Sequence, residues 1–157
     1  YRLTGASARW KENEAMATPC VAFFTLAEVC DRWGMKPLQI GACAVEGQLI
    51  LSVVLAGQFA ELGAWEEIRE NDWQRMPEEQ RQLTGVFDLF RRDAWAIIKD
   101  GSRFVADMDA GPGRYISLRP SEEGGVTVTA DDLLLRRTEV ERFEAENGMG
   151  ALPEPLL

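Results

Sequence analysis

Histidine is absent from the 157 residues of this chain. The sequence therefore lacks the commonest general base near neutral pH and the commonest transition-metal ligand. Its cysteines, Cys20, Cys30 and Cys43, form no CxxC pair, and an odd count fits reduced thiols better than a disulfide framework. No apolar run reaches the roughly 18 residues of a membrane-spanning helix, and no signal peptide is visible. We expect a cytoplasmic protein with no metal site and no membrane span.

Positive charge is scarce as well. Lysine and arginine number 17 against 26 acidic residues, the net charge is −9, and no cation lies between Lys36 and Arg69. Nucleic-acid affinity comes mainly from lysine and arginine displacing counterions, and acidic surfaces repel phosphate. The composition therefore disfavours general nucleic-acid binding, although it leaves room for a local basic patch.

Hydrophobic residues are plentiful, at 46% of the chain, which is enough for a sizeable core at this length. We expect an N-terminal arm over residues 1–20, a single α+β domain over 21–147, and a C-terminal linker over 148–157. The chain opens on Tyr1 rather than methionine and closes on a stretch rich in glycine and proline. We therefore expect it to be a portion of a longer protein.

A helix, turn, helix, strand pattern occupies residues 25–55. Thr25 and Glu28 form a capping box, and Gly34 is placed to end the first helix. Pro37 favours the start of a second helix, which ends at Gly47. The alternation of apolar residues over 49–55 then predicts a strand.

The rest of the chain mixes short helices and strands. Residues 58–63 are expected to form a linker, 64–69 a helical turn or an edge strand, and 77–81 a helix start. Strong turn chemistry at 109–113 predicts a hairpin between strands 104–108 and 114–118. Further predicted elements are strands at 85–90 and 126–128, a turn plus strand at 131–136, a helix at 91–99, and a closing helix up to 147 opened by a Thr138/Glu141 capping box.

The stretch FTLAEVCDRWGMKPLQIGACAVEGQLIL resembles the excisionase-like and MerR-like winged helix-turn-helix families. The shared marks are the TLAEV helix start, the aromatic-glycine turn at Trp33-Gly34 and the step at Glu46-Gly47 into a wing strand. The later segment LLLRRTEVERFE is similar to the strand and helix that close those domains. The chain also looks like uncharacterised accessory proteins of bacterial phages and mobile elements. The resemblance implies an α+β fold with a winged helix-turn-helix-like core at 21–56 and 126–147, and a small inserted antiparallel β region at 57–125.

In DNA-binding members of such families, side chains of the second helix reach base edges in the major groove. Here only Lys36 and Gln39 could hydrogen-bond a base, and the wing over 48–58 offers no cation. Two arginine pairs are better candidates for phosphate contacts, unless they form ordinary salt bridges with the surplus acids. The candidate DNA-contact residues are Lys36, Gln39, Arg91, Arg92, Arg136 and Arg137.

Three tryptophans, Trp10, Trp65 and Trp73, lie in polar, weakly patterned segments. Trp65 and Trp73 flank an acidic stretch that begins with Glu66 and Glu67. Exposed tryptophan tends to anchor protein interfaces, and the acids would suit a partner with a basic rim. Burial of both rings in the core is the alternative.

Catalytic motifs are missing. Serine and threonine have no histidine partner, no GxSxG exists, and the segment DMDAG lacks the glycine and glutamate of a calcium loop. We expect no catalytic residue and no cofactor. The favoured function is a non-enzymatic regulatory or accessory module acting through protein–protein contacts or self-association. The alternatives are a DNA-binding transcriptional or mobile-element regulator, which uses the arginine pairs or a domain outside this chain, and an acidic DNA mimic.

Overall fold

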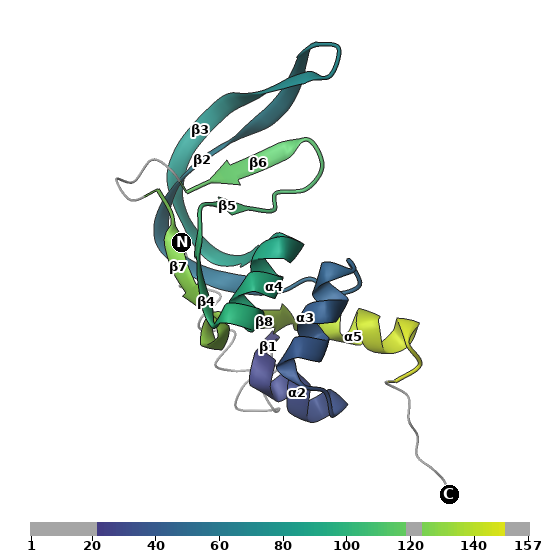
Figure 1. Cartoon of the computed structure of the whole chain (residues 1–157). Coiled ribbons are helices and arrows are strands. Elements are labelled where there is room, and N and C mark those ends of the chain that lie inside the picture. Colours follow the sequence, from purple (N-terminus) through teal and green to yellow (C-terminus); the bar gives the residue numbers. More distant parts are fainter. Residues whose placement is uncertain (1–21, 119–123, 150–157) are drawn as a thin grey trace, which may run out of the picture.

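The computed structural model describes residues 22–118 and 124–149 (Figure 1). Its elements in chain order are β1 (Phe23–Thr25), α2 (Leu26–Trp33), α3 (Pro37–Val45), β2 (Ser52–Arg69), β3 (Asp72–Asp88), α4 (Arg91–Asp100), β4 (Ser102–Val105), β5 (Asp107–Met108), β6 (Arg114–Ser117), β7 (Val126–Thr129), the 3-10 turn η1 (Ala130–Asp132), β8 (Leu134–Arg136) and α5 (Arg137–Glu146). The helices gather at one end of the molecule, and the β2–β3 hairpin curves away toward the other.

The two predicted N-terminal helices are confirmed, together with their boundary signals. The hydroxyl of Thr25 accepts a hydrogen bond from the Glu28 amide, and the Glu28 carboxylate accepts one from the Thr25 amide. Gly34 ends α2 in the left-handed region at φ 66°, and Pro37 opens α3. Local chemistry therefore sets both helices, as their sequence indicated.

A long antiparallel hairpin replaces the expected linker and helix start. β2 and β3 pair from Ser52↔Asp88 to Arg69↔Asp72, with register shifts at three places. Asn71 adopts φ 62° in the turn between the strands. The predictions of a linker at 58–63 and of a helix start at 77–81 are wrong. The bulges, the proline and the dense charge interrupt the period-two alternation by which a strand is recognised.

The main sheet is six-stranded and antiparallel, in the order β1-β8-β2-β6-β5, with β3 on β2. β4 and β7 form a separate pair. The turn predicted at 109–113 does join a hairpin, in which Met108 pairs with Ile116. The predicted helix at 91–99 is confirmed as α4. The closing helix begins at Arg137 with Arg136 as its N-cap, so the expected Thr138/Glu141 capping box is wrong.

The expected fold class is wrong. The structure is 46% strand and 33% helix, with a large antiparallel sheet rather than a helix-dominated winged helix-turn-helix. The physical reason lies in β2. The strand expected as a wing continues without a break from Ser52 to Arg69, so the supposed core at 21–56 and the supposed insertion at 57–125 share one sheet.

One core joins the helices to the sheet. Fully buried side chains come from two helices and from two neighbouring strands of the sheet, namely Ile40 on α3, Ile97 on α4, Val53 on β2 and Leu135 on β8. α3 and α4 approach closely because Gly41 has no side chain: a Cβ there would lie 2.9 Å from the Trp95 ring. The position of α3 is therefore fixed by tight packing on its inner face.

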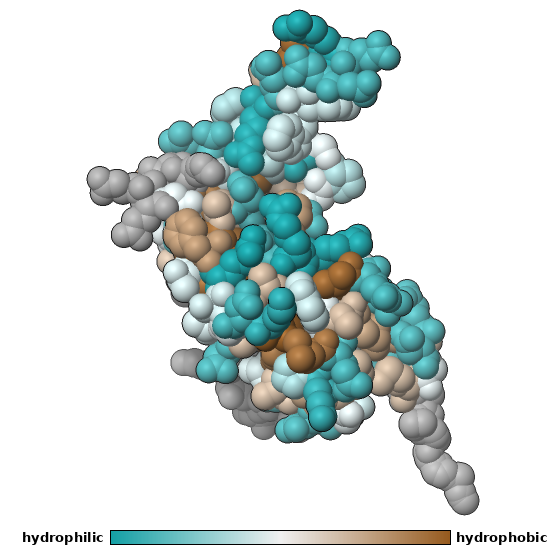
Figure 2. Space-filling model, viewed as in Figure 1, coloured by the Kyte–Doolittle hydropathy of each residue, from teal (hydrophilic) through white to brown (hydrophobic). Residues whose placement is uncertain are grey.

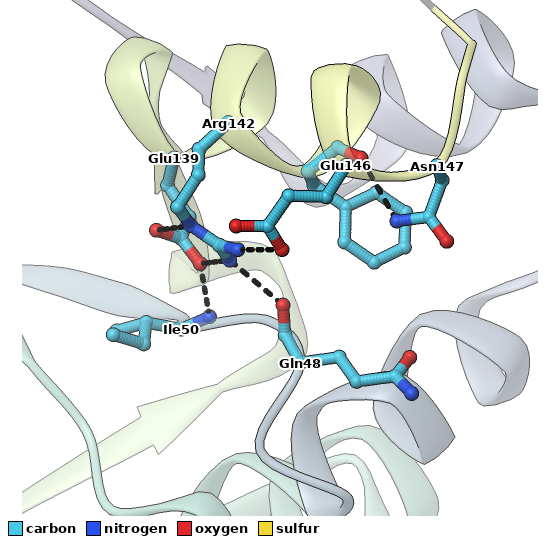
Figure 3. Close-up of polar contacts among 7 residues, drawn as sticks. Gln48, Ile50, Glu139, Arg142, Glu146 and Asn147 are labelled. Carbon is cyan, nitrogen blue, oxygen red and sulfur yellow. Dashed lines mark hydrogen bonds and ion pairs between the residues drawn. The ribbon is translucent and has the colours of Figure 1, made fainter.

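A polar network fastens α5 to the loop between α3 and β2 (Figure 3). The Arg142 guanidinium donates to Glu139 at 2.6 Å, to Glu146 at 2.6 Å and to the Gln48 carbonyl at 2.7 Å. Glu139 also accepts the Ile50 amide at 2.9 Å. The two carboxylates hold the pKa of Arg142 above its ordinary value. The network thus ties the loop that follows α3 to α5.

Candidate protein-binding site

The distal part of the β2–β3 hairpin stands apart from the rest of the sheet. β6 pairs with β2 only from Glu61 to Ala64, and a last hydrogen bond runs from the Trp65 amide to the Gly113 carbonyl. Beyond that point residues 65–75, hereafter the ribbon, are two strands paired only with each other. A two-stranded ribbon is marginally stable alone, so its base must hold it.

Strand alternation sorts the predicted interface residues onto two faces. Trp65 pairs with Arg75 and Glu67 pairs with Trp73, so these four side chains share one face, hereafter the tryptophan face. Glu66 lies on the opposite face. The structure thus brings together three of the four predicted residues and separates the fourth, because neighbouring residues of a strand point to opposite sides.

Arg75 anchors the tryptophan face to the sheet beneath. Its guanidinium carbon lies 5.3 Å from the centroid of the Trp65 ring and 4.8 Å from that of Tyr115. Its Nη2 is 3.2 Å from Asp107 Oδ1 on β5. Trp65 and Tyr115 are themselves tilted ring neighbours at 5.8 Å. Cation–π contacts and an ion pair therefore fix the base of the ribbon.

Tyr115 completes this base from β6. Its hydroxyl donates to Glu61 at 2.8 Å, and burial followed by this hydrogen bond raises the pKa of Tyr115 to about 12. Gly63 leaves room for the ring, since a Cβ there would lie 2.7 Å from the Tyr115 hydroxyl oxygen and 2.3 Å from the Met76 carbonyl oxygen. The base of the ribbon therefore packs against a buried, neutral phenol.

Trp73 is the more exposed of the two tryptophans on the tryptophan face. It is 55% exposed, against 38% for Trp65, and no ring contact involves it within the described residues. Its register partner Glu67 accepts a hydrogen bond from the Asn71 amide at 2.9 Å, which orders the turn. A large exposed indole on an anchored ribbon is chemically suited to insert into a pocket of another protein.

The ribbon tip is acidic. Four carboxylates lie between residues 66 and 72, against the single cation Arg69, whose partner is Asp72 at 3.6 Å. Figure 2 shows the hairpin as a largely hydrophilic surface that projects from the body of the molecule. A partner with basic groups around its binding pocket would complement this charge.

The candidate DNA-contact residues lie apart from the ribbon. Gln39 caps α3 by accepting the Lys36 amide at 2.7 Å. Arg91 donates to the Val45 carbonyl at the end of α3, and Arg92 lies 3.9 Å from the carboxylate of the next residue. These contacts therefore cap the two ends of α3 or form a local ion pair.

The second arginine pair is also engaged within the fold. Arg136 donates to Asp88 and to the Val86 carbonyl, which ties β8 to the end of β3. Arg137 pairs with Glu141 one turn along α5. These contacts are the ordinary salt bridging that the sequence left open as an alternative.

No family model matches the chain, and neither the curated proteins nor the solved structures contain a significant match. The resemblance to winged helix-turn-helix families therefore stays a prediction. Within residues 22–118 and 124–149 no helix is long and apolar enough to cross a membrane. The same residues contain no cluster of three or more potential metal ligands.

Sequence reasoning missed Arg75 and Tyr115, because strand register alone brings them to Trp65. One signal was available. Glu70-Asn71 is a two-residue turn between segments that carry Trp65 and Trp73, and asparagine tolerates the positive φ that such hairpin turns require. That turn predicts the hairpin, but a regular pairing from it would set Trp73 opposite Ile68, on the other face from Trp65. The register shift between Glu67 and Arg69 is what brings both tryptophans to one face.

Proposed function

We propose that this protein is a non-enzymatic regulatory or accessory module that binds another protein through the tryptophan face of the ribbon. The observation that carries the proposal is the exposed indole of Trp73 on the same face as Trp65. Arg75 and Tyr115 hold the ring of Trp65 in place. Tryptophan, tyrosine and arginine are the residue types enriched at the energetic centres of interfaces. Trp65 is ordered by these contacts before a partner binds, so its side chain loses little entropy on binding.

The acidic tip defines the partner further. The partner presents an apolar pocket for Trp73 with lysine or arginine at its rim. Rim charges act mostly on the association rate and are screened by salt. Association should therefore slow as the ionic strength rises, while the dissociation rate changes little.

The experiment is affinity capture with three baits: the chain itself, Trp73→Ala and Met76→Ala. Met76 is 38% exposed on the opposite face of the hairpin, so it is a matched apolar truncation. We expect one protein to be retained by the chain and by Met76→Ala and lost with Trp73→Ala. Equal retention by all three baits, or loss with both variants, would contradict the proposal.

Binding to duplex DNA at low salt separates this function from the alternative regulator. We expect no rise in fluorescence anisotropy of a labelled random duplex. Salt-sensitive binding that is lost with Arg91→Ala and Arg92→Ala would instead favour DNA contact through the arginine pairs.

A further inference from the structure

The outer face of α3 carries an apolar stripe that the fold leaves uncovered. Leu38, Ala42 and Val45 recur at i, i+4 and i+7, so they line one side of the helix. Leu38 is 54% and Val45 39% exposed, and Ala42 is exposed as well. A hollow of about 330 Å³ beside the stripe is lined by Ala42, Val45, Glu46 and Trp95. Figure 2 shows apolar surface over α3 and its junction with α4.

The stripe is rigid. The opposite side of α3 buries Ile40, Gly41 and Ala44 against the core. Its C-terminal end is held by Arg91, which donates to the Val45 carbonyl, and by Arg142, which donates to the carbonyl of Gln48 in the next loop. A fixed apolar helix face favours docking of a second rigid surface, because little freedom is lost on association.

Charge along α3 indicates what that second surface is. The helix PLQIGACAV has no charged residue, but Lys36 precedes it and Glu46 follows it. In an antiparallel pair of identical helices, Lys36 of each copy lies next to Glu46 of the other. The two helix dipoles are then antiparallel, which places the positive end of each helix beside the negative end of the other. A nine-residue helix spans about 14 Å, so both ends meet in the same register.

The same register suits the apolar side chains. Antiparallel pairing that matches residue 36 with residue 46 is centred near residue 41, so Leu38 packs toward Val45 of the second copy. Ala42 lies close to the centre, where a small side chain permits a short distance between the helix axes. The surface is therefore self-complementary, as a two-fold interface must be.

We propose that two copies of this chain associate through antiparallel α3 helices, with Leu38, Ala42 and Val45 at the centre and two Lys36–Glu46 ion pairs at the ends. The interface does not include the ribbon, so it is independent of the proposed partner binding.

Sedimentation equilibrium of the whole chain over a range of concentrations tests the proposal. The chain is expected to be a dimer, and Leu38→Glu a monomer with an unchanged circular dichroism spectrum, because Leu38 is exposed. Met76→Glu, an equally drastic change on the hairpin, is expected to leave the dimer intact. A monomer at about 100 μM, or a dimer unaffected by Leu38→Glu, would overturn the proposal.

Charge reversal tests the antiparallel register. Lys36→Glu and Glu46→Lys each place like charges together at both ends, and each is expected to weaken the dimer by about tenfold or more. The double variant recreates both pairs with reversed polarity and is expected to recover most of the lost affinity. Absence of recovery would exclude the proposed pairing. Trp73→Ala is expected to leave the dimer unchanged, so failure of the proposed partner binding and failure of this dimer are distinguishable.

Discussion

At the scale of single residues, the contacts that matter most join segments distant in sequence. Tyr115 supports Trp65 and Arg75 of the ribbon from another strand. Glu144 plays a similar part among the helices, since it accepts hydrogen bonds from the side chains of Arg32 and Trp33. Both side chains are nearly buried, so each polar contact is protected from water and worth more than on the surface.

Tyr115 should lose its phenolic proton only at a pH well above that of an exposed tyrosine. The chain has two tyrosines, so Tyr1→Phe leaves Tyr115 as the only phenol. Burial and the hydrogen bond to Glu61 raise its pKa to about 12, which predicts a phenolate absorbance transition near that pH. Spectrophotometric titration at 295 nm measures it, with circular dichroism recorded alongside to identify alkaline unfolding. A transition near pH 10 in the folded protein would contradict the buried position.

Glu144 should make stability depend on acid pH. Hydrogen bonds from Arg32 lower its pKa below the ordinary value of about 4.3 in the unfolded chain. The resulting stabilisation is complete above the unfolded pKa and is lost as pH falls through the folded pKa. Glu144→Gln should therefore cost about 1–2 kcal/mol at pH 7 and reduce the loss of stability in acid.

Urea unfolding at neutral and acid pH measures both effects. Glu141→Gln is the control, because Glu141 is an exposed partner of Arg137 on the same helix. Such i,i+4 pairs contribute only about 0.3–0.5 kcal/mol. Equal effects of the two variants at neutral pH would mean that Glu144 does not join α2 to α5.

At the scale of elements, what can be foreseen from sequence depends on whether a signal is local. Thr25, Gly34 and Pro37 act within a few residues, so both N-terminal helices were predictable. The two ends of the hairpin were predicted as the strands at 49–55 and 85–90, but its middle was not. Beyond Ala64 both faces of the ribbon are open, so no hydrophobic alternation marks the strands there. Trp65 and Trp73 were recognised as candidates because residue type and local sequence are enough to single them out. Arg75 and Tyr115 were not, because only the pairing of distant strands brings them to Trp65.

The packing of α3 on α4 gives a prediction at this scale. Gly41→Ala would place a Cβ 2.9 Å from the Trp95 ring and 3.3 Å from Ile98 Cδ1. Overpacking typically costs about 1–3 kcal/mol, which exceeds the gain of about 1 kcal/mol in helix propensity. Thermal or urea unfolding should show net destabilisation. Net stabilisation would mean that α3 and α4 are less closely packed.

At the scale of the whole molecule, the net charge of −9 is compatible with local binding surfaces of different character. The ribbon tip concentrates carboxylates around an exposed indole, whereas α3 shows an uncharged apolar stripe at the helical end. If both surfaces act, a dimer would present two ribbons, and a partner with two pockets could bind both with increased avidity.

The central claim is that Trp73 anchors a partner protein, and the most direct test is the affinity of the captured partner for purified variants. Isothermal titration calorimetry with the chain, Trp73→Ala and Met76→Ala compares one interface anchor with its matched control. Trp73→Ala should raise Kd at least about 30-fold, equivalent to about 2 kcal/mol, with Met76→Ala close to the unaltered chain. Equal affinities of all three proteins would contradict a binding site on the tryptophan face.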